Sequence, residues 1–111
     1  MNYQVLLRVN AKDGQYIPVG EKHPVVWEVR DLISESSGWT ALNQDVIGPA
    51  KAFIPMLERG IWELTHHESD YSRFEAMHGL GTIRETLGFY CDLLNDCKDH
   101  PFSELYGVVS A

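Results

Sequence analysis

The chain has 111 residues and a formal net charge of −7, with 44% hydrophobic and 23% charged residues. This length and composition are typical of one globular domain. No apolar run approaches the roughly 20 residues of a membrane-spanning helix, and the first residues lack the features of a signal peptide. The negative charge disfavours binding to the phosphate backbones of nucleic acids and to anionic membranes. We therefore expect a cytoplasmic protein that binds neither nucleic acid nor membrane.

The first 35 residues are mainly β in pattern. Residues 3–9 alternate in polarity and include β-branched and aromatic side chains, which predicts a strand. Asp13-Gly14 is a favoured hairpin dipeptide, so we expect residues 15–19 to form the return strand. Pro18 lacks a backbone N–H, which places this second strand at an edge of the sheet.

The next segment predicts a third strand. A second turn is expected at residues 20–24, and the third strand at residues 25–29. Residues 30–35 fit either a helical turn or more strand. The Ser-Ser-Gly run at residues 36–38 ends whichever element precedes it. The N-terminal segment therefore predicts a small antiparallel sheet of about three strands.

Two apolar stripes predict a pair of helices. Their members recur at intervals of three and four, which keeps each stripe on one helical face. The first stripe comprises Ile47, Ala50, Ile54, Leu57, Ile61 and Leu64, and the second comprises Ala76, Leu80, Ile83, Leu87, Tyr90, Leu94 and Cys97. A short polar connection at residues 66–72 separates them, so we expect an antiparallel helical hairpin.

The ends of both helices carry sequence signals. The Gly-Pro pair at residues 48–49 marks the first start, because proline is tolerated in the first helical turn. Pro55 is expected to kink this helix or delay its start. The second helix is expected to begin near Ser69 or Asp70, which are good N-caps, and to end before Pro101.

Strands followed by helices are typical of the α+β class. We predict a single domain over residues 1–111, in which the N-terminal sheet packs on the helical hairpin of residues 46–98. Residues 102–111 form a short C-terminal segment, with a strand expected at 106–109. Because the apolar arc is wider than one partner helix would cover, we also expect a homodimer whose hairpins form a four-helix bundle.

The negative charge is concentrated in the helical half. Residues 58–111 hold ten acidic and four basic side chains, whereas residues 1–57 hold six and five. Glu85, Asp92 and Asp96 form an acidic line on the second helix, facing away from its apolar stripe. Such a line is either an ordinary solvent-exposed face or a recognition surface for a basic protein.

The leading functional hypothesis is a non-enzymatic interaction module, such as an inhibitor, adaptor or immunity-like protein. It would bind a basic protein surface through Glu85, Asp92 and Asp96. The sequence contains neither a Gly-x-Ser-x-Gly nucleophile motif nor a phosphate-binding loop, so no catalytic residue and no cofactor is expected.

The alternative is a small-molecule-binding or enzymatic domain with an apolar, aromatic-lined pocket. Aromatic side chains are numerous for one small domain, and those beyond the needs of the core could line such a pocket. The candidate residues are Trp39, Trp62, Tyr90 and His78, of which His78 faces away from the apolar stripe.

Polar residues at the tip of the hairpin are weak candidates for metal ligands. His66, His67 and Glu68 are consecutive, with Glu63 and Asp70 nearby. Imidazole and carboxylate groups bind zinc-like ions, but they are also common in solvated loops, which is the interpretation we favour.

The two cysteines are not expected to pair. Cys91 and Cys97 lie on the expected second helix, about 9 Å apart along its axis at ~1.5 Å per residue. A disulfide tolerates a Cα separation of about 7 Å, which an intact helix cannot provide here. Cys97 belongs to the apolar stripe and is expected to be a small core residue.

Overall fold

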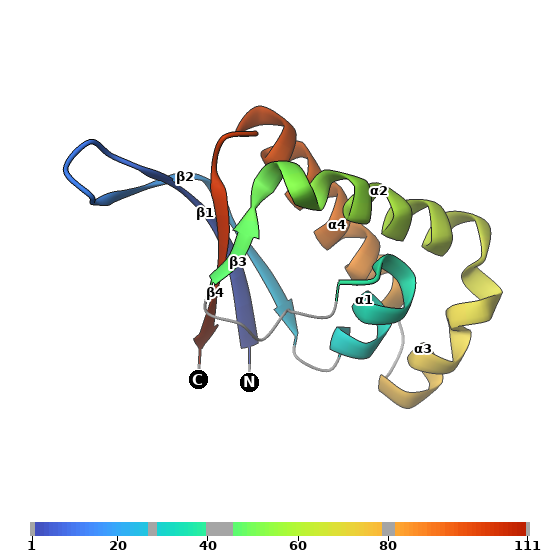
Figure 1. Cartoon of the computed structure of the whole chain (residues 1–111). Helices are drawn as coiled ribbons and strands as arrows, with labels where there is room; N and C mark the ends of the chain where they lie inside the picture. The colour runs from blue at the N-terminus through green and yellow to red at the C-terminus, as the bar shows by residue number, and fades with distance from the viewer. Residues whose placement is uncertain (1, 27–28, 40–45, 79–81, 111) are drawn as a thin grey trace.

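The computed structural model describes residues 2–26, 29–39, 46–78 and 82–110. The elements in chain order are β1 (Asn2–Asn10), β2 (Tyr16–Val26), α1 (Arg30–Ser37), β3 (Val46–Pro49), α2 (Ala50–His66), the 3-10 helix η2 (Glu68–Tyr71), α3 (Ser72–His78), α4 (Thr82–Asp99) and β4 (Glu104–Ser110). The helices lie on one side of an antiparallel sheet (Figure 1). This arrangement confirms the predicted α+β class.

The sheet has the strand order β2-β1-β4-β3, with every neighbouring pair antiparallel. The Asp13-Gly14 hairpin is confirmed: Gly14 has a φ of 83°, and the N–H of Ala11 donates to the carbonyl of Gln15 at 2.7 Å. The prediction from Pro18 is also confirmed, because β2 is an edge strand.

The sheet has four strands rather than about three. The C-terminal segment supplies β4, which lies between β1 and β3. The third strand expected at residues 25–29 is not a separate element, since Val25 and Val26 end β2 and Val29 caps α1. The strand expected at 106–109 is confirmed as part of β4, but a strand pattern does not say which strand will pair with it.

The turn expected near Gly20 is a β-bulge inside β2. Val5 of β1 pairs with His23, and two residues later the partner is Val19. Residues 20–22 therefore oppose a single residue of β1, which bends and twists the strand without ending it. Gly20 has a φ of 69°, a conformation that glycine adopts without steric cost.

The first predicted helix is α2. It begins directly after the Gly-Pro pair, and Pro55 lies inside it without delaying its start. Ile47 of the predicted stripe lies in β3, before the helix. Ile54 and Ile61 of the predicted stripe are only half-buried, whereas Gly60 is buried. The buried face of the helix is therefore rotated toward Gly60 relative to the predicted stripe. The buried residues of the helix are Ala50, Phe53, Leu57, Gly60 and Leu64.

The prediction of one continuous second helix is wrong. Residues 68–99 form η2, α3 and α4, and residues 79–81, which include Leu80 of the predicted stripe, lie outside the described residues. Gly79 and Gly81 adjoin this interruption, and glycine costs a helix roughly 1 kcal/mol relative to alanine. The buried residues of α4 are Thr82, Ile83, Thr86, Phe89, Tyr90, Leu93, Leu94, Asp96 and Cys97.

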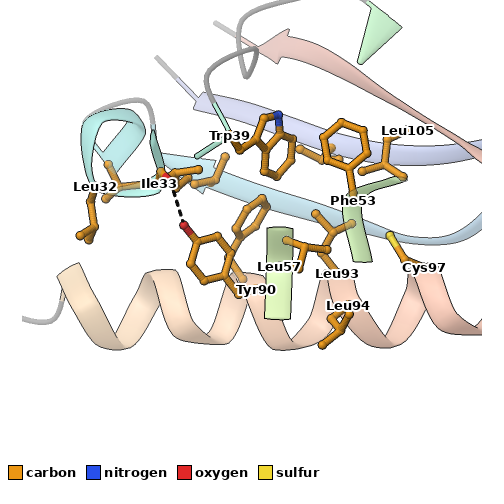
Figure 2. Packing of buried hydrophobic residues seen from close by; sticks show 14 of the residues in the cluster. Leu32, Ile33, Trp39, Phe53, Leu57, Tyr90, Leu93, Leu94, Cys97 and Leu105 are labelled. Carbon is orange, nitrogen blue, oxygen red and sulfur yellow. Dashed lines mark hydrogen bonds between the residues drawn. The ribbon is translucent and has the colours of Figure 1, made fainter. Parts of the chain in front are cut away.

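The core lies between the sheet and the helices and is rich in aromatic contacts. Trp39 stacks on Phe89 with ring centroids 6.1 Å apart and meets Phe53 edge-on at 5.0 Å. Figure 2 shows Tyr90 reaching from α4 toward α1, where its hydroxyl donates to the carbonyl of Ile33 at 3.2 Å. α1 therefore adopts the helical alternative and ends at Gly38, as the Ser-Ser-Gly run predicts.

None of the helices within the described ranges is long and apolar enough to cross a membrane.

Candidate functional site

A buried contact between His23 and Asp96 joins the bulge of β2 to α4. Nε2 of His23 lies 2.6 Å from Oδ2 of Asp96, and the backbone N–H of Glu21 donates to the same oxygen at 2.8 Å. His23 is 5% exposed and Asp96 is 9% exposed. Since a carboxylate only accepts hydrogen bonds, the imidazole carries its hydrogen on Nε2. The pair thus connects two segments more than 70 residues apart in sequence.

The backbone of the bulge requires this partner. A bulge removes residues from the β ladder and leaves their N–H groups without a strand partner. Asp96 supplies the missing acceptor for Glu21. A Cβ atom at Gly20 would collide with the Asp96 carboxylate, so close approach as well as its positive φ requires glycine there.

An acidic hollow surrounds this pair. Its volume is about 320 Å³, and it lies between the bulge of β2 and the C-terminal half of α4. The lining residues are Glu21, His23, Asp92, Asn95, Asp96 and Asp99. Nε2 of the His100 imidazole lies 3.9 Å from Oδ1, the second oxygen of Asp96.

An apolar hollow of about 280 Å³ lies farther along the same two elements. It is lined by Pro24, Val25, Val26, Val29, Glu85, Thr86 and Phe89. A middle hollow of about 300 Å³ shares Glu85 and Phe89 with the apolar hollow, and His23 and Asp92 with the acidic one. Neighbouring hollows thus share lining residues, and we call the three together the β2–α4 groove, with an acidic end and an apolar end.

Two of the three residues predicted to bind protein lie exposed on this groove. Glu85 is at the apolar and middle hollows, and Asp92 is at the middle and acidic hollows. The expectation that Asp96 faces solvent is wrong. Its carboxylate is turned toward β2 because the bulge there presents an N–H and an imidazole that need an acceptor.

The residues of the alternative hypothesis are not brought together. Trp39 and Tyr90 are core residues, 2% and 0% exposed, and do not line the groove. Burial raises the pKa of the Tyr90 hydroxyl to about 12. Trp62 is 51% exposed on α2, where its ring stacks on His66 at 4.8 Å. The side chain of His78 lies outside the described residues.

The hairpin tip does not form a cluster of ligands. His67 and Asp70 are both exposed, with Nδ1 and Oδ2 3.7 Å apart. Nδ1 of His66 is hydrogen-bonded to the backbone carbonyl of Trp62 at 3.0 Å. Within the described part of the chain, Glu68 joins no group of three or more His, Cys, Asp or Glu side chains that could hold a metal ion.

Sequence reasoning missed the contributions of Gly20, Glu21 and His23. A glycine inside an alternating segment is a known sign of a bulge, so Gly20 carried a usable signal. His23 carried none, because its importance comes from Asp96, which is 73 residues away.

The described lining of the acidic end is rich in hydrogen-bond acceptors. The acidic end offers carboxylates, one amide and one imidazole, and none of its lining residues carries a hydroxyl or thiol nucleophile. His23 is held by Asp96, with Nε2 of the imidazole 2.6 Å from Oδ2 of the carboxylate. The carboxylates around this contact suit the recognition of a positively charged group.

No family model matches the chain, and no curated protein or solved structure is significantly similar to it.

Proposed function

We propose that this chain is a non-enzymatic protein-interaction module that binds a basic segment of another protein in the β2–α4 groove. The class of module is that of inhibitors, adaptors and immunity-like proteins, acting in the cytoplasm. The groove joins an edge strand to the acidic helix, and it contains both exposed residues of the acidic line.

The observation that carries the proposal is the charge of the groove. Its lining includes five carboxylates and a single lysine, Lys22. A concave surface lined by charges of one sign concentrates the electrostatic field and attracts partners of the opposite charge. Such complementarity mainly accelerates association and selects the partner, while apolar contacts contribute affinity.

The test is a pair of charge reversals. Asp92→Lys should weaken binding of a lysine- and arginine-rich peptide at least fivefold and reduce the salt dependence of its association rate. Glu58→Lys is the matched control, because Glu58 is exposed on α2 and does not line the groove. Equal weakening by both variants would mean that the peptide responds only to net charge, and the proposed site would be wrong.

One observation favours the small-molecule alternative. The apolar end of the groove has a floor formed by Val25, Val29 and Phe89, which are all buried. Mostly apolar hollows with a few polar groups are typical of ligand sites. Under this alternative the aromatic lining comes from Phe89 rather than from Trp39 or Tyr90. An uncharged apolar ligand that raises the melting temperature, and fails to do so in Gly88→Gln, would favour it.

Self-association is proposed through a different surface from the four-helix bundle. The predicted apolar stripes mostly pack inside one chain, whereas the outer face of the sheet has no helix over it (Figure 1). On this face Val26 and Val108 are 40% and 42% exposed. Two opposite charges of the sheet, Arg8 and Glu104, neutralise each other in an ion pair at 2.7 Å. A second copy therefore meets no net repulsion there, unlike at the acidic helices.

Light scattering after size-exclusion chromatography tests this assembly. We expect twice the chain mass of 12.6 kDa for the unmodified protein and one chain mass for Val108→Lys. Trp62→Lys, on the exposed side of α2, is the control that should remain a dimer. A monomeric unmodified protein at micromolar concentration would rule out the dimer.

A further inference from the structure

We infer that the β2–α4 groove recognises a two-part motif in an extended segment: a bulky apolar side chain and, four residues later or earlier, an arginine. The inference rests on the proposed function and specifies the chemistry of its partner. It follows from the different character of the two ends of the groove and from the distance between them.

The apolar end is shaped for one uncharged side chain. Val25, Val29 and Phe89 are 7%, 3% and 7% exposed, so they form a buried apolar floor. Thr86 is buried beside them, and among the described residues of the lining Glu85 alone is charged. A leucine, methionine or phenylalanine of a partner would cover this apolar surface. Removing the apolar surface from water makes the free energy of binding more favourable.

The acidic end is shaped for a guanidinium group. Oδ2 of Asp96 accepts from both Glu21 and His23, which fixes the orientation of the carboxylate. Oδ1 accepts no hydrogen bond from any described residue, and it belongs to a side chain that lines the acidic hollow. Asp92 and Asp99 stand on the same hollow and are exposed.

Arginine fits this set better than lysine. A guanidinium presents five N–H donors in a planar fork and can bridge two carboxylates, whereas an ammonium is a compact, strongly hydrated charge. The acceptors here are Oδ1 of the largely buried Asp96 and the exposed carboxylates of Asp92 and Asp99. Together they can accept several hydrogen bonds from one planar guanidinium group. The preference for arginine therefore depends on the His23–Asp96 contact, because that contact fixes the orientation of the Asp96 carboxylate.

The spacing follows from α4. Thr86 at the apolar end and Asp96 at the acidic end are ten residues apart, which is about 15 Å at ~1.5 Å per residue. An extended segment advances roughly 3.3 Å per residue, and side chains two or four residues apart point the same way. Positions four apart are thus separated by about 13 Å and face the groove together.

Side chains, rather than a continuous β ladder, must hold the segment. β2 is an edge strand, but Pro24 has no N–H to donate to an added strand, and the N–H of Glu21 is already bound to Asp96. The two ends of the groove therefore set the specificity.

Three capped pentapeptides test the motif by amide chemical-shift titration of the full-length, 15N-labelled protein. They are Leu-Ser-Thr-Ser-Arg, its rearrangement Leu-Arg-Ser-Thr-Ser, and Ser-Ser-Thr-Ser-Arg, which all carry the same charge. We expect the first to bind at least fivefold more tightly than the other two, with shifts along residues 85–96. Replacing its arginine by lysine should weaken binding at least threefold.

Two exposed positions provide the protein variants. Gly88 lines the middle hollow with open space where a Cβ would be, so Gly88→Gln should obstruct the groove and Gly88→Ala should not. Asp92→Asn should weaken the first peptide, and Glu58→Gln should leave it unchanged.

The outcomes separate the motif from the proposed function. Equal binding of all three peptides, still weakened by Asp92→Asn, would overturn the two-part motif and leave the basic-partner function in place. Binding that ignores Asp92→Asn and Gly88→Gln alike would overturn both. Tight binding of the first peptide that Gly88→Gln abolishes would support both.

Discussion

Replacing Asp96 by alanine tests whether the buried pair holds β2 against α4. The change leaves the Glu21 N–H and the His23 imidazole without an acceptor in a buried site. A buried donor left unpaired costs about 1–3 kcal/mol, and this change leaves two such donors. The Asp96 side chain is 11% exposed, so solvent screens it little. We expect a loss of about 3–4 kcal/mol in the free energy of unfolding.

Urea denaturation followed by circular dichroism measures this loss. With a denaturant slope near ~2 kcal/mol per molar, the midpoint of Asp96→Ala should fall by about 1.5–2 M. Asp99→Ala is the matched control. Asp99 lines the same hollow but is exposed, so its removal should change stability by no more than about 0.5 kcal/mol.

A double-mutant cycle identifies the interaction itself. His23→Ala alone should destabilise the protein, and the coupling energy between the His23 and Asp96 changes should be about 1–3 kcal/mol. A coupling near zero, or an Asp96→Ala variant as stable as Asp99→Ala, would refute the account of the bulge as dependent on this carboxylate.

The other predictions concern glycine contacts and buried titratable groups. A Cβ at Gly60 would collide with the ring of Tyr90, so Gly60→Ala should lower stability by about 1–2 kcal/mol in urea denaturation. Gly88→Ala, made where nothing lies within contact distance, should raise stability by up to about 1 kcal/mol; the opposite order would contradict the packing of α2 on α4. Because burial raises the pKa of Tyr90 to about 12 from a usual value of 10.0, its neutral form is favoured in the folded state. Stability should therefore be retained below pH 10 and decline as the pH rises from 10 toward 12, with a shallower decline in Tyr90→Phe. Burial likewise raises the pKa of Cys97 to about 12, whereas Cys91 is exposed. A disulfide-exchange reagent at pH 8 should label one thiol in the folded protein and two in denaturant, and rapid labelling of both in the folded state would contradict the burial of Cys97.

Local signals in the sequence were sufficient for several elements. Asp13-Gly14, the pair at residues 48–49 and the run at residues 36–38 each act through backbone conformations of glycine or proline that need no distant partner. The hairpin, the start of α2 and the end of α1 were therefore predicted correctly.

The errors occurred where distant residues decide the outcome. Gly20 favours either a turn or a bulge, and the structure places the bulge where Asp96 can accept from Glu21. The same contact explains why Asp96 appeared, from helical periodicity alone, to belong to the solvent face. Periodicity assigns polar residues to water, but a polar residue can instead face an unpaired backbone group. From the sequence we could thus predict the α4 side of the groove, through Glu85 and Asp92, but not the side formed by β2.

The central position of β1 has a consequence for how the chain folds during synthesis. β1 pairs with β2 through a tight local hairpin, but its other neighbour is β4, with Asn2 opposite Ser110. β1 is synthesised before β4, so its second edge stays unpaired until the intervening helices and β4 have also been made. Contacts so distant in sequence slow folding, because a long loop must close before they form. Until then β1 presents an open edge and an apolar face, which chaperones could recognise. Joining the neighbouring ends and reopening the chain at the Asp13-Gly14 turn would make the β1–β4 pairing local, and we expect such a permutant to fold faster than the natural order.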